Sequence, residues 1–352
     1  MTYCHRTLFF PLDCATAAMS DMDPTKAGIV SAACQFPEQR RSARELFREE
    51  SLNSPAETIE RLGIEEVPLC LGHKGSELAV AASLEALARA GVSGADVDVV
   101  VDYTILPQKW MVPVWNMSGE VQKEVGAEKA FTVGFSGGGS TNFLVALNFA
   151  AAMLEADEKM KYALLVAGDV TIPGNRVLNP ASPVSVMGDG ASAVLLQRGA
   201  PGRTVLGSEL LSDGANHDVY YIPGGCLANP EDPALYRMVL DKPRYDRAPK
   251  ASTMLQLARK LLDRVGLKLE DVRYVVYPNI SLEDQNAFRE SFGLRPEQIC
   301  TSNLATHGHL QGNDLVLNYM SLTEHGAVNE GDYILICSHG MGFMSGVTLI
   351  RI

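Results

Sequence analysis

GVSGADVDVVVDYT (residues 91–104) and GLKLEDVRYVVYPN (266–279) carry the pattern that decides the fold. In each stretch a helix end is followed by a short polar connection with a carboxylate, and then by an apolar run rich in β-branched residues. Such a run is typical of a strand that is buried on both faces of a sheet. Because two distant parts of the chain repeat one plan, we interpret the sequence as an internal duplication.

The duplication extends to two further pairs of strands. KYALLVAGDV (161–170) is echoed by GDYILICSHG (331–340), and ASAVLLQRG (191–199) is echoed by SGVTLIRI (345–352). All four stretches are near-continuous apolar runs of strand length, as in the first pair. The strands therefore follow one another in the same order in both halves.

Helical patterns lie between these strands. SELAVAASLEALARAG (76–91) precedes the first strand, and TMLQLARKLLDRVG (253–266) precedes its echo. STNFLVALNFAAAMLEAD (140–157) is apolar nearly all round, which predicts a central, buried helix, and NDLVLNYMSLTEHG (313–326) takes the equivalent place in the second half. We therefore predict an α/β fold of five layers, αβαβα, built from two duplicated halves.

The predicted halves divide the chain into three parts. Residues 1–25 form an N-terminal extension, residues 26–200 form the first half, and residues 201–352 form the second half. The first half contains a glycine-rich turn with two serines before its central helix, and the second half contains a segment with histidine and aspartate.

The composition argues against several classes of function. The 352 residues carry a net charge of -12, which disfavours nucleic acid as a partner. No run approaches the roughly 20 apolar residues of a membrane span, and the first ten residues lack the features of a secretory signal. The seven cysteines form no CxxC pair and no metal spacing, and their odd number indicates free thiols in a reducing cytoplasm.

Several short motifs resemble those of the ketoacyl-ACP synthase III enzymes of the thiolase superfamily. MGDGASAVLL (187–196) is similar to their GDGAGA segment, ERLGI (60–64) to RTGI, and HGH (307–309) to HGN. SHGMGFMSGVTLIRI (338–352) resembles their glycine-rich closing loop and last strand. The resemblance runs from about residue 26 to the C-terminus and implies the thiolase fold.

The resemblance implies a catalytic cysteine at the N-terminus of the buried helix, and this chain has none there. FTVGFSGGGSTNF (131–143) offers two serines instead. Reading SGGG as the family's Cys-x-Gly-Gly pattern makes Ser136 the nucleophile, whereas counting back from the helix favours Ser140. We expect Ser136 to be the nucleophile and Ser140 to cap the helix, since serine is a common N-cap residue.

The family's histidine and asparagine are also replaced. Pro278 and Asn279 stand where the resemblance implies the histidine, and His309 stands where it implies the asparagine. Because a serine hydroxyl is un-ionised at neutral pH and needs a general base, His309 is expected to supply that base. Asp314 is expected to orient the imidazole, so that Cys-His-Asn becomes Ser-His-Asp. A helix-capping role for Asp314, and Asp332 as the orienting residue, remain alternatives.

Other residues complete the predicted site. His217 is a further catalytic candidate if its segment faces the acyl pocket. Gly342 matches the closing-loop glycine, and the resemblance implies that the N–H of this glycine helps to bind the oxyanion. Of the residues that hold CoA in the family, this chain keeps only Arg61. Ser140 and Asn279 are the other expected substrate-binding residues.

The resemblance also implies the substrates and partners. A thioester of CoA or of phosphopantetheine is expected as substrate, with acyl-CoA or an acyl carrier protein as donor and no separate cofactor or metal. KWMVPVW (109–115), with both tryptophans of the chain, predicts the interface of a homodimer.

Three functions follow from these departures. We expect an acyltransferase that forms an acyl-serine intermediate and passes the acyl group to a carrier protein or small molecule in polyketide or other secondary metabolism. A condensing ketosynthase that selects a starter unit is the first alternative, although the absent histidine weakens decarboxylation. A catalytically silent scaffold is the second alternative, and a matched histidine and aspartate argue against it.

Overall fold

The computed structural model describes residues 25–50, 52, 56–72, 75–110, 114–225, 229–324 and 328–352. All but the last residue of the predicted N-terminal extension, 1–25, therefore lies outside the described residues. No described helix is long and apolar enough to cross a membrane.

The largest sheet in the described part of the chain has nine strands in the order β13-β14-β15-β10-β1-β9-β6-β4-β5. These strands are β1 (Ala27–Gln35), β4 (Val99–Asp102), β5 (Phe131–Gly134), β6 (Tyr162–Asp169), β9 (Gly190–Arg198), β10 (Thr204–Ser212), β13 (Val272–Val276), β14 (Tyr333–Gly340) and β15 (Met344–Arg351).

The strand order shows the duplication directly. In the first half β4 pairs in parallel with β6, and β6, β9 and β1 follow in antiparallel pairs. In the second half β13 pairs in parallel with β14, and β14, β15 and β10 follow in antiparallel pairs. The two halves meet where β1 pairs with β10, with Gly28 opposite Thr204. Even β5, which pairs in parallel with β4, has a small counterpart in the parallel bridge between Val275 and Ile299.

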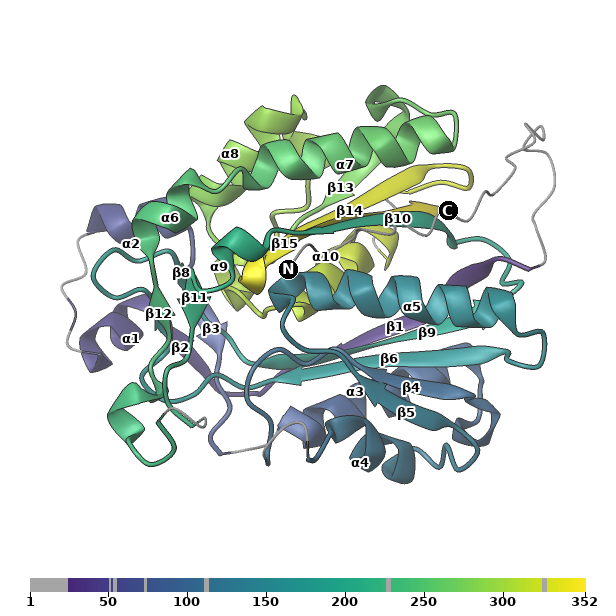
Figure 1. Cartoon of the computed structure of the whole chain (residues 1–352), viewed down its shortest axis with the longest axis horizontal. Coiled ribbons are helices and arrows are strands. Elements are labelled where there is room, and N and C mark those ends of the chain that lie inside the picture. Colours follow the sequence, from purple (N-terminus) through teal and green to yellow (C-terminus); the bar gives the residue numbers. More distant parts are fainter. Residues whose placement is uncertain are drawn as a thin grey trace, which may run out of the picture.

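The helices form the other three layers (Figure 1). The central layer holds α5 (Asn142–Ala156) and α10 (Asn313–Glu324) between the two halves of the sheet. One outer layer holds α3 (Gly75–Ala90) and α4 (Met117–Glu124), and the other holds α7 (Lys250–Arg264) and α8 (Leu282–Phe292). The predicted α/β fold with αβαβα layers is confirmed.

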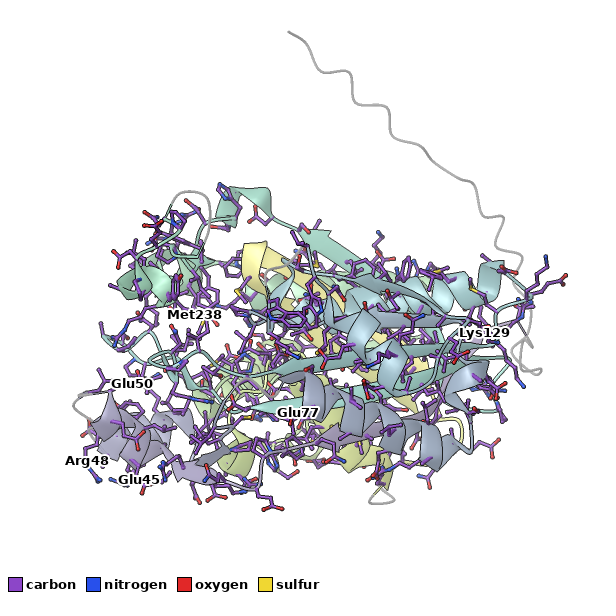
Figure 2. The ribbon with its side chains drawn as sticks, turned by 90° about the horizontal axis from the view of Figure 1, so that it is seen from below. Glu45, Arg48, Glu50, Glu77, Lys129 and Met238 are labelled. Carbon is purple, nitrogen blue, oxygen red and sulfur yellow. The ribbon has the colours of Figure 1, made fainter. Side chains whose placement is uncertain are left out.

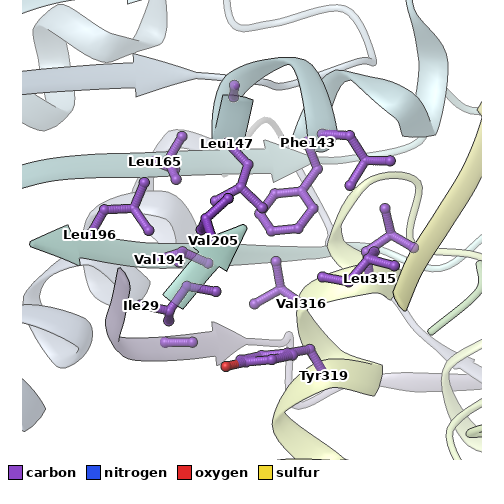
Figure 3. Close-up of a cluster of buried hydrophobic side chains, with 14 of the residues drawn as sticks. Ile29, Phe143, Leu147, Leu165, Val194, Leu196, Val205, Leu315, Val316 and Tyr319 are labelled. Carbon is purple, nitrogen blue, oxygen red and sulfur yellow. The ribbon is translucent and has the colours of Figure 1, made fainter. Parts of the chain in front are cut away.

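The central helices are apolar nearly all round because both halves of the sheet cover them. Figure 3 shows Phe143 and Leu147 of α5 close to Val316 of α10, among valines and leucines of the strands. These side chains are at most 1% exposed. Since burial of one such side chain stabilises a fold by about 1.5–3 kcal/mol, this layer holds the two halves together and fixes the N-termini of both helices.

The remaining elements gather toward one end of the molecule. Figure 2 shows Met238 at the same end as Glu45 of α1 and Glu50 directly after it, and Lys129 at the opposite end. These elements are α1 (Ala43–Glu49), α2 (Ala56–Leu62), α6 (Lys242–Arg247), α9 (Leu304–His307), β2 (Arg40–Ser42), β3 (Glu66–Pro68), β7 (Val177–Leu178), β8 (Ser185–Val186), β11 (Tyr220–Tyr221) and β12 (Val239–Leu240).

Candidate functional site

The turn between β5 and α5 is braced by one side chain. Gly138 donates its N–H to Oδ1 of Asn142 (2.9 Å), and Nδ2 of Asn142 donates to the carbonyl oxygen of Phe135 (3.2 Å). Asn142 is the first residue of α5, and the 3₁₀ turn η2 (Gly139–Thr141) precedes it. The glycine-rich segment, which could take many conformations, is thereby held in one.

A loop from the second half packs directly on this turn. Gly340 ends β14, and a Cβ atom at this position would overlap the carbonyl oxygen of Gly138. A Cβ atom on Gly139 would in the same way overlap the backbone nitrogen of Met341. Only glycine allows the two backbones to approach so closely. The site is therefore built from both halves of the chain.

Substitution of Gly340 by alanine is expected to destabilise the protein by about 1–3 kcal/mol, because the two backbones must separate. Gly119 of α4 is the matched control, since nothing lies within 4 Å of an added Cβ there. Thermal unfolding should show a lower midpoint for Gly340→Ala and an unchanged or higher one for Gly119→Ala. Equal midpoints for the two variants would contradict the close approach.

Ser140 and His309 line the same cavity, which we call the inner cavity. It has a volume of about 60 Å³, and its walls are mostly apolar. Ser140 enters from η2 and His309 from the loop after α9, and they are 5% and 6% exposed. The apolar wall is formed by Leu178, Met187, Leu240, Ile280, Met341 and Phe343.

Ser136 does not share the inner cavity. It lies two residues after the end of β5 and is exposed. It lines a separate cavity of about 280 Å³ together with Gln108 and Tyr221. Gly137, Gly138 and Gly139 separate Ser136 from Ser140, which lies inside the η2 turn. The choice of Ser136 over Ser140 is therefore not supported by the geometry. Nor does Ser140 cap the helix: the N-cap of α5 is Thr141, without a side-chain cap bond.

His309 is oriented by a buried carboxylate. Its Nδ1–H donates to Oδ2 of Asp314 (2.6 Å), and Asp314 is completely buried. Oδ2 also accepts the N–H of Asn279 (2.8 Å), and Oδ1 accepts the N–H of Leu310 (2.8 Å). Because a carboxylate can only accept, the His309 proton is held on Nδ1, and Nε2 is left with its lone pair.

This contact agrees with the orienting role predicted for Asp314. It is not the N-cap arrangement that was the alternative, because its acceptors serve His309 and the preceding loop. Asp332 lies elsewhere and accepts the N–H of Asn329 (2.8 Å).

The first half of the chain fixes the backbone of His309. Its N–H donates to the carbonyl oxygen of Val186 (3.0 Å), and its own carbonyl oxygen accepts the N–H of Gly188 (3.1 Å). The imidazole from the second half is therefore held in register with the end of β8.

Three predicted site residues lie away from the inner cavity. His217 is exposed after the 3₁₀ turn η3 (Gly214–Asn216). Gly342 packs its backbone near the carbonyl oxygen of Gly137, and Met341 lines the cavity in its place. The Asn279 side chain is buried in a network, where its Oδ1 accepts from Asn318 (2.9 Å). Asn279 therefore serves the site through its N–H bond to Asp314.

Arg61 lies on a wider, outer cavity of about 560 Å³, which it lines with Lys250 and Asp284. Its Nη1 donates to Glu283 (2.6 Å), and its Nη2 donates to the carbonyl oxygen of Pro183 (2.7 Å). Tyr245 lines both the outer and the inner cavity. The role of Arg61 in holding CoA stays a prediction.

The sequence interpretation missed His339, which also lines the inner cavity. Burial is the main cause that lowers the pKa of this imidazole to about 3. The residue lies inside the SHGMGF segment, so its position in the closing loop was visible. Nothing in an apolar run tells which of its side chains will face a cavity.

The segment around the two tryptophans is partly exposed. The rings of Trp110 and Trp115 meet edge to face, with centroids 5.1 Å apart. Trp110 is 57% and Val114 is 89% exposed, while residues 111–113 lie outside the described residues. The homodimer interface stays a prediction.

Comparisons with known proteins agree with this architecture. A family model described as 3-oxoacyl-[acyl-carrier-protein] synthase III matches residues 138–214, and one for the C-terminal part of that family matches residues 262–352. A β-ketoacyl-[acyl-carrier-protein] synthase III of Rhodobacter capsulatus is 29% identical over 287 residues, which cover 80% of this chain and 85% of the relative.

Two solved structures have the same fold. The priming β-ketosynthase from the R1128 polyketide biosynthetic pathway superposes with a TM-score of 0.80 at 23% identity, covering 93% of this chain and 96% of the other. ChlB3, described as an acyltransferase, superposes with a TM-score of 0.77 at 21% identity, covering 93% of this chain and 98% of the other.

Proposed function

We propose that this chain is an acyltransferase with an acyl-serine intermediate on Ser140. Its thiolase fold and its similarity to the ketoacyl-ACP synthase III family support an acyl-transferring enzyme. One observation carries the proposal. Ser140 and His309 line one cavity, and His309 donates to a fully buried Asp314.

In the first half-reaction Nε2 of His309 takes the proton of the Ser140 hydroxyl. The serine oxygen attacks the thioester carbonyl, and the C–S bond breaks as the acyl ester forms. The imidazolium returns its proton to the departing thiolate, so that a thiol leaves. Asp314 stabilises the imidazolium during this step through its hydrogen bond to Nδ1.

The surroundings of Ser140 suit the negative charge that develops on the carbonyl oxygen. Ser140 precedes the N-terminus of α5, where the helix dipole favours an anion. The backbone of Met341 packs against the same turn and lines the same cavity. We assign the oxyanion site to this space between the turn and the closing loop.

In the second half-reaction an acceptor thiol, hydroxyl or amine takes the acyl group. His309 removes the acceptor's proton as it attacks the ester, and returns it to the oxygen of Ser140. An acyl-CoA or acyl carrier protein suits the donor role, because a phosphopantetheine arm could pass from the outer cavity beside Tyr245. Secondary metabolism, in particular polyketide priming, is the setting that we propose.

A condensing ketosynthase is the second candidate, and the comparisons favour it. The similar proteins are named as synthases, one of them as a priming β-ketosynthase. Pro278 argues against it, since it brings no hydrogen-bonding side chain to the end of β13. A homodimer through the segment around Trp110 and Trp115 accompanies either function.

Intact-mass measurement after incubation with acyl-CoAs and acyl carrier proteins tests the proposal. An adduct of the mass of the acyl group, mapped to Ser140, is expected. The absence of any adduct with every thioester would contradict acyl transfer and favour a silent scaffold. Release of CO₂ from a malonyl donor, with a longer product, would favour condensation instead.

A further inference from the structure

The inner cavity contains a second imidazole. His339, the residue before the last in β14, is 4% exposed and lines this cavity together with Ser140 and His309. Its Nε2 atom is buried and has no hydrogen-bond partner among the described residues. The proposed mechanism, which uses His309 and Asp314, gives this nitrogen no task.

The surroundings keep this imidazole neutral. The ring packs near Tyr245, Tyr277 and Phe343, with centroid distances of 6.3, 6.1 and 6.5 Å. Burial, followed by the positive charges of Lys250 and protonated His309, lowers the pKa of His339 to about 3. At neutral pH the ring therefore has one N–H and one lone pair, and it is a weak base.

A buried polar nitrogen without a partner is costly. Such a nitrogen has lost its hydrogen bonds to water, and most buried polar groups in folded proteins have a partner. Leu240 and Ile280 form part of the cavity wall, and although Ser140 and Gln311 also line the cavity, none of the described residues bonds to this nitrogen. A bound molecule is thus a natural partner, and in the tautomer that carries the ring proton on Nε2 the matching group is an oxygen acceptor.

We propose that His339 binds the substrate directly, by a hydrogen bond from its Nε2–H to an uncharged carbonyl oxygen of the acyl thioester, and so positions the thioester for attack by Ser140. The proposal rests on the proposed function. It also names the substrate class: acyl groups that are neutral near the reacting carbonyl. An anionic group such as a malonyl carboxylate would be poorly solvated between these apolar walls.

Two variants of the full chain test this role. His339→Phe keeps an aromatic ring and removes the donor, whereas His339→Gln keeps an N–H donor of similar reach. Acylation by propionyl-CoA and by malonyl-CoA is followed by intact mass at several concentrations, and thermal unfolding is measured in parallel. We expect His339→Phe to slow propionylation about tenfold or more, and His339→Gln to keep most of the rate.

The stability measurement separates this role from a structural one. His339→Phe removes an unpartnered nitrogen, so its unfolding midpoint should be equal to or above that of the wild type. Loss of stability together with activity in His339→Phe would mean that the imidazole serves the fold, and would overturn the proposal. An unchanged propionylation rate, or faster acylation of the wild type by malonyl-CoA than by propionyl-CoA, would overturn it as well.

The failures of the two proposals remain distinguishable. If the wild type forms no adduct with these two thioesters or with any other acyl-CoA or acyl carrier protein, the proposed function fails, and the role of His339 falls with it. If the wild type forms an adduct on Ser140 and His339→Phe forms it equally fast, only the role of His339 fails.

Discussion

The Ser140→Ala variant is expected to form no acyl adduct, whereas Ser136→Ala should form it at close to the wild-type rate. Ser140 shares the inner cavity with His309, and Ser136 is exposed on a different cavity. Removal of a serine nucleophile commonly costs a factor of about 10⁶ in rate, so the adduct should fall below detection.

The measurement is the same for both variants: intact mass at fixed times after addition of a thioester, followed by peptide mapping. Both changes remove one hydroxyl, so a general effect of losing a serine from this turn would appear in both. Loss of the adduct in Ser136→Ala, with Ser140→Ala unaffected, would show that the reactive turn differs from the structure described above.

The Asp314→Asn variant is expected to slow acylation by about 10³- to 10⁴-fold, because it changes the tautomer of His309. An amide of the same size keeps the packing, and its oxygen can still accept from Leu310 or Asn279. If its NH₂ group faces Nδ1 of His309, the histidine proton must move to Nε2. The imidazole then has no lone pair toward Ser140.

Asp332→Asn is the matched control for this variant. Asp332 is the other carboxylate of the second half that was an orienting candidate, and its side chain accepts hydrogen bonds from Asn329. We expect Asp332→Asn to change the acylation rate less than twofold. Single-turnover acylation measures the effect without the acceptor step, and circular dichroism confirms the fold. A rate for Asp314→Asn within tenfold of the wild type would refute the triad.

Much of the fold was visible in local patterns. The run 161–170 became β6 (Tyr162–Asp169), the run 331–340 became β14 (Tyr333–Gly340), and the apolar segment 140–157 became α5 with its start two residues later. Buried strands and a buried helix are apolar along their whole length, and in a duplicated chain each such pattern occurs twice. The three two-stranded sheets β2–β3, β7–β8 and β11–β12 were not predicted, because strands of two or three residues have no period.

The site was only partly predictable. His309 and Asp314 lie five residues apart in one segment, so their contact depends on a short loop, and the prediction agrees with the structure. Asn279 and His217 were placed from the resemblance alone, and their burial and exposure show that neither side chain lines the inner cavity.

The sequence by itself determined that the chain has two equivalent halves. It also determined that a glycine-rich turn with two serines precedes the central helix, and that a histidine and an aspartate lie close together in the other half. Only the tertiary structure placed one of the two serines, Ser140, in the cavity that His309 also lines. Glycine has no Cβ and permits many backbone paths, so counting residues through Gly137–Gly139 cannot fix where Ser136 and Ser140 lie. The path is set by the Asn142 side chain and by the close approach of Gly340, which are contacts between segments far apart in the chain.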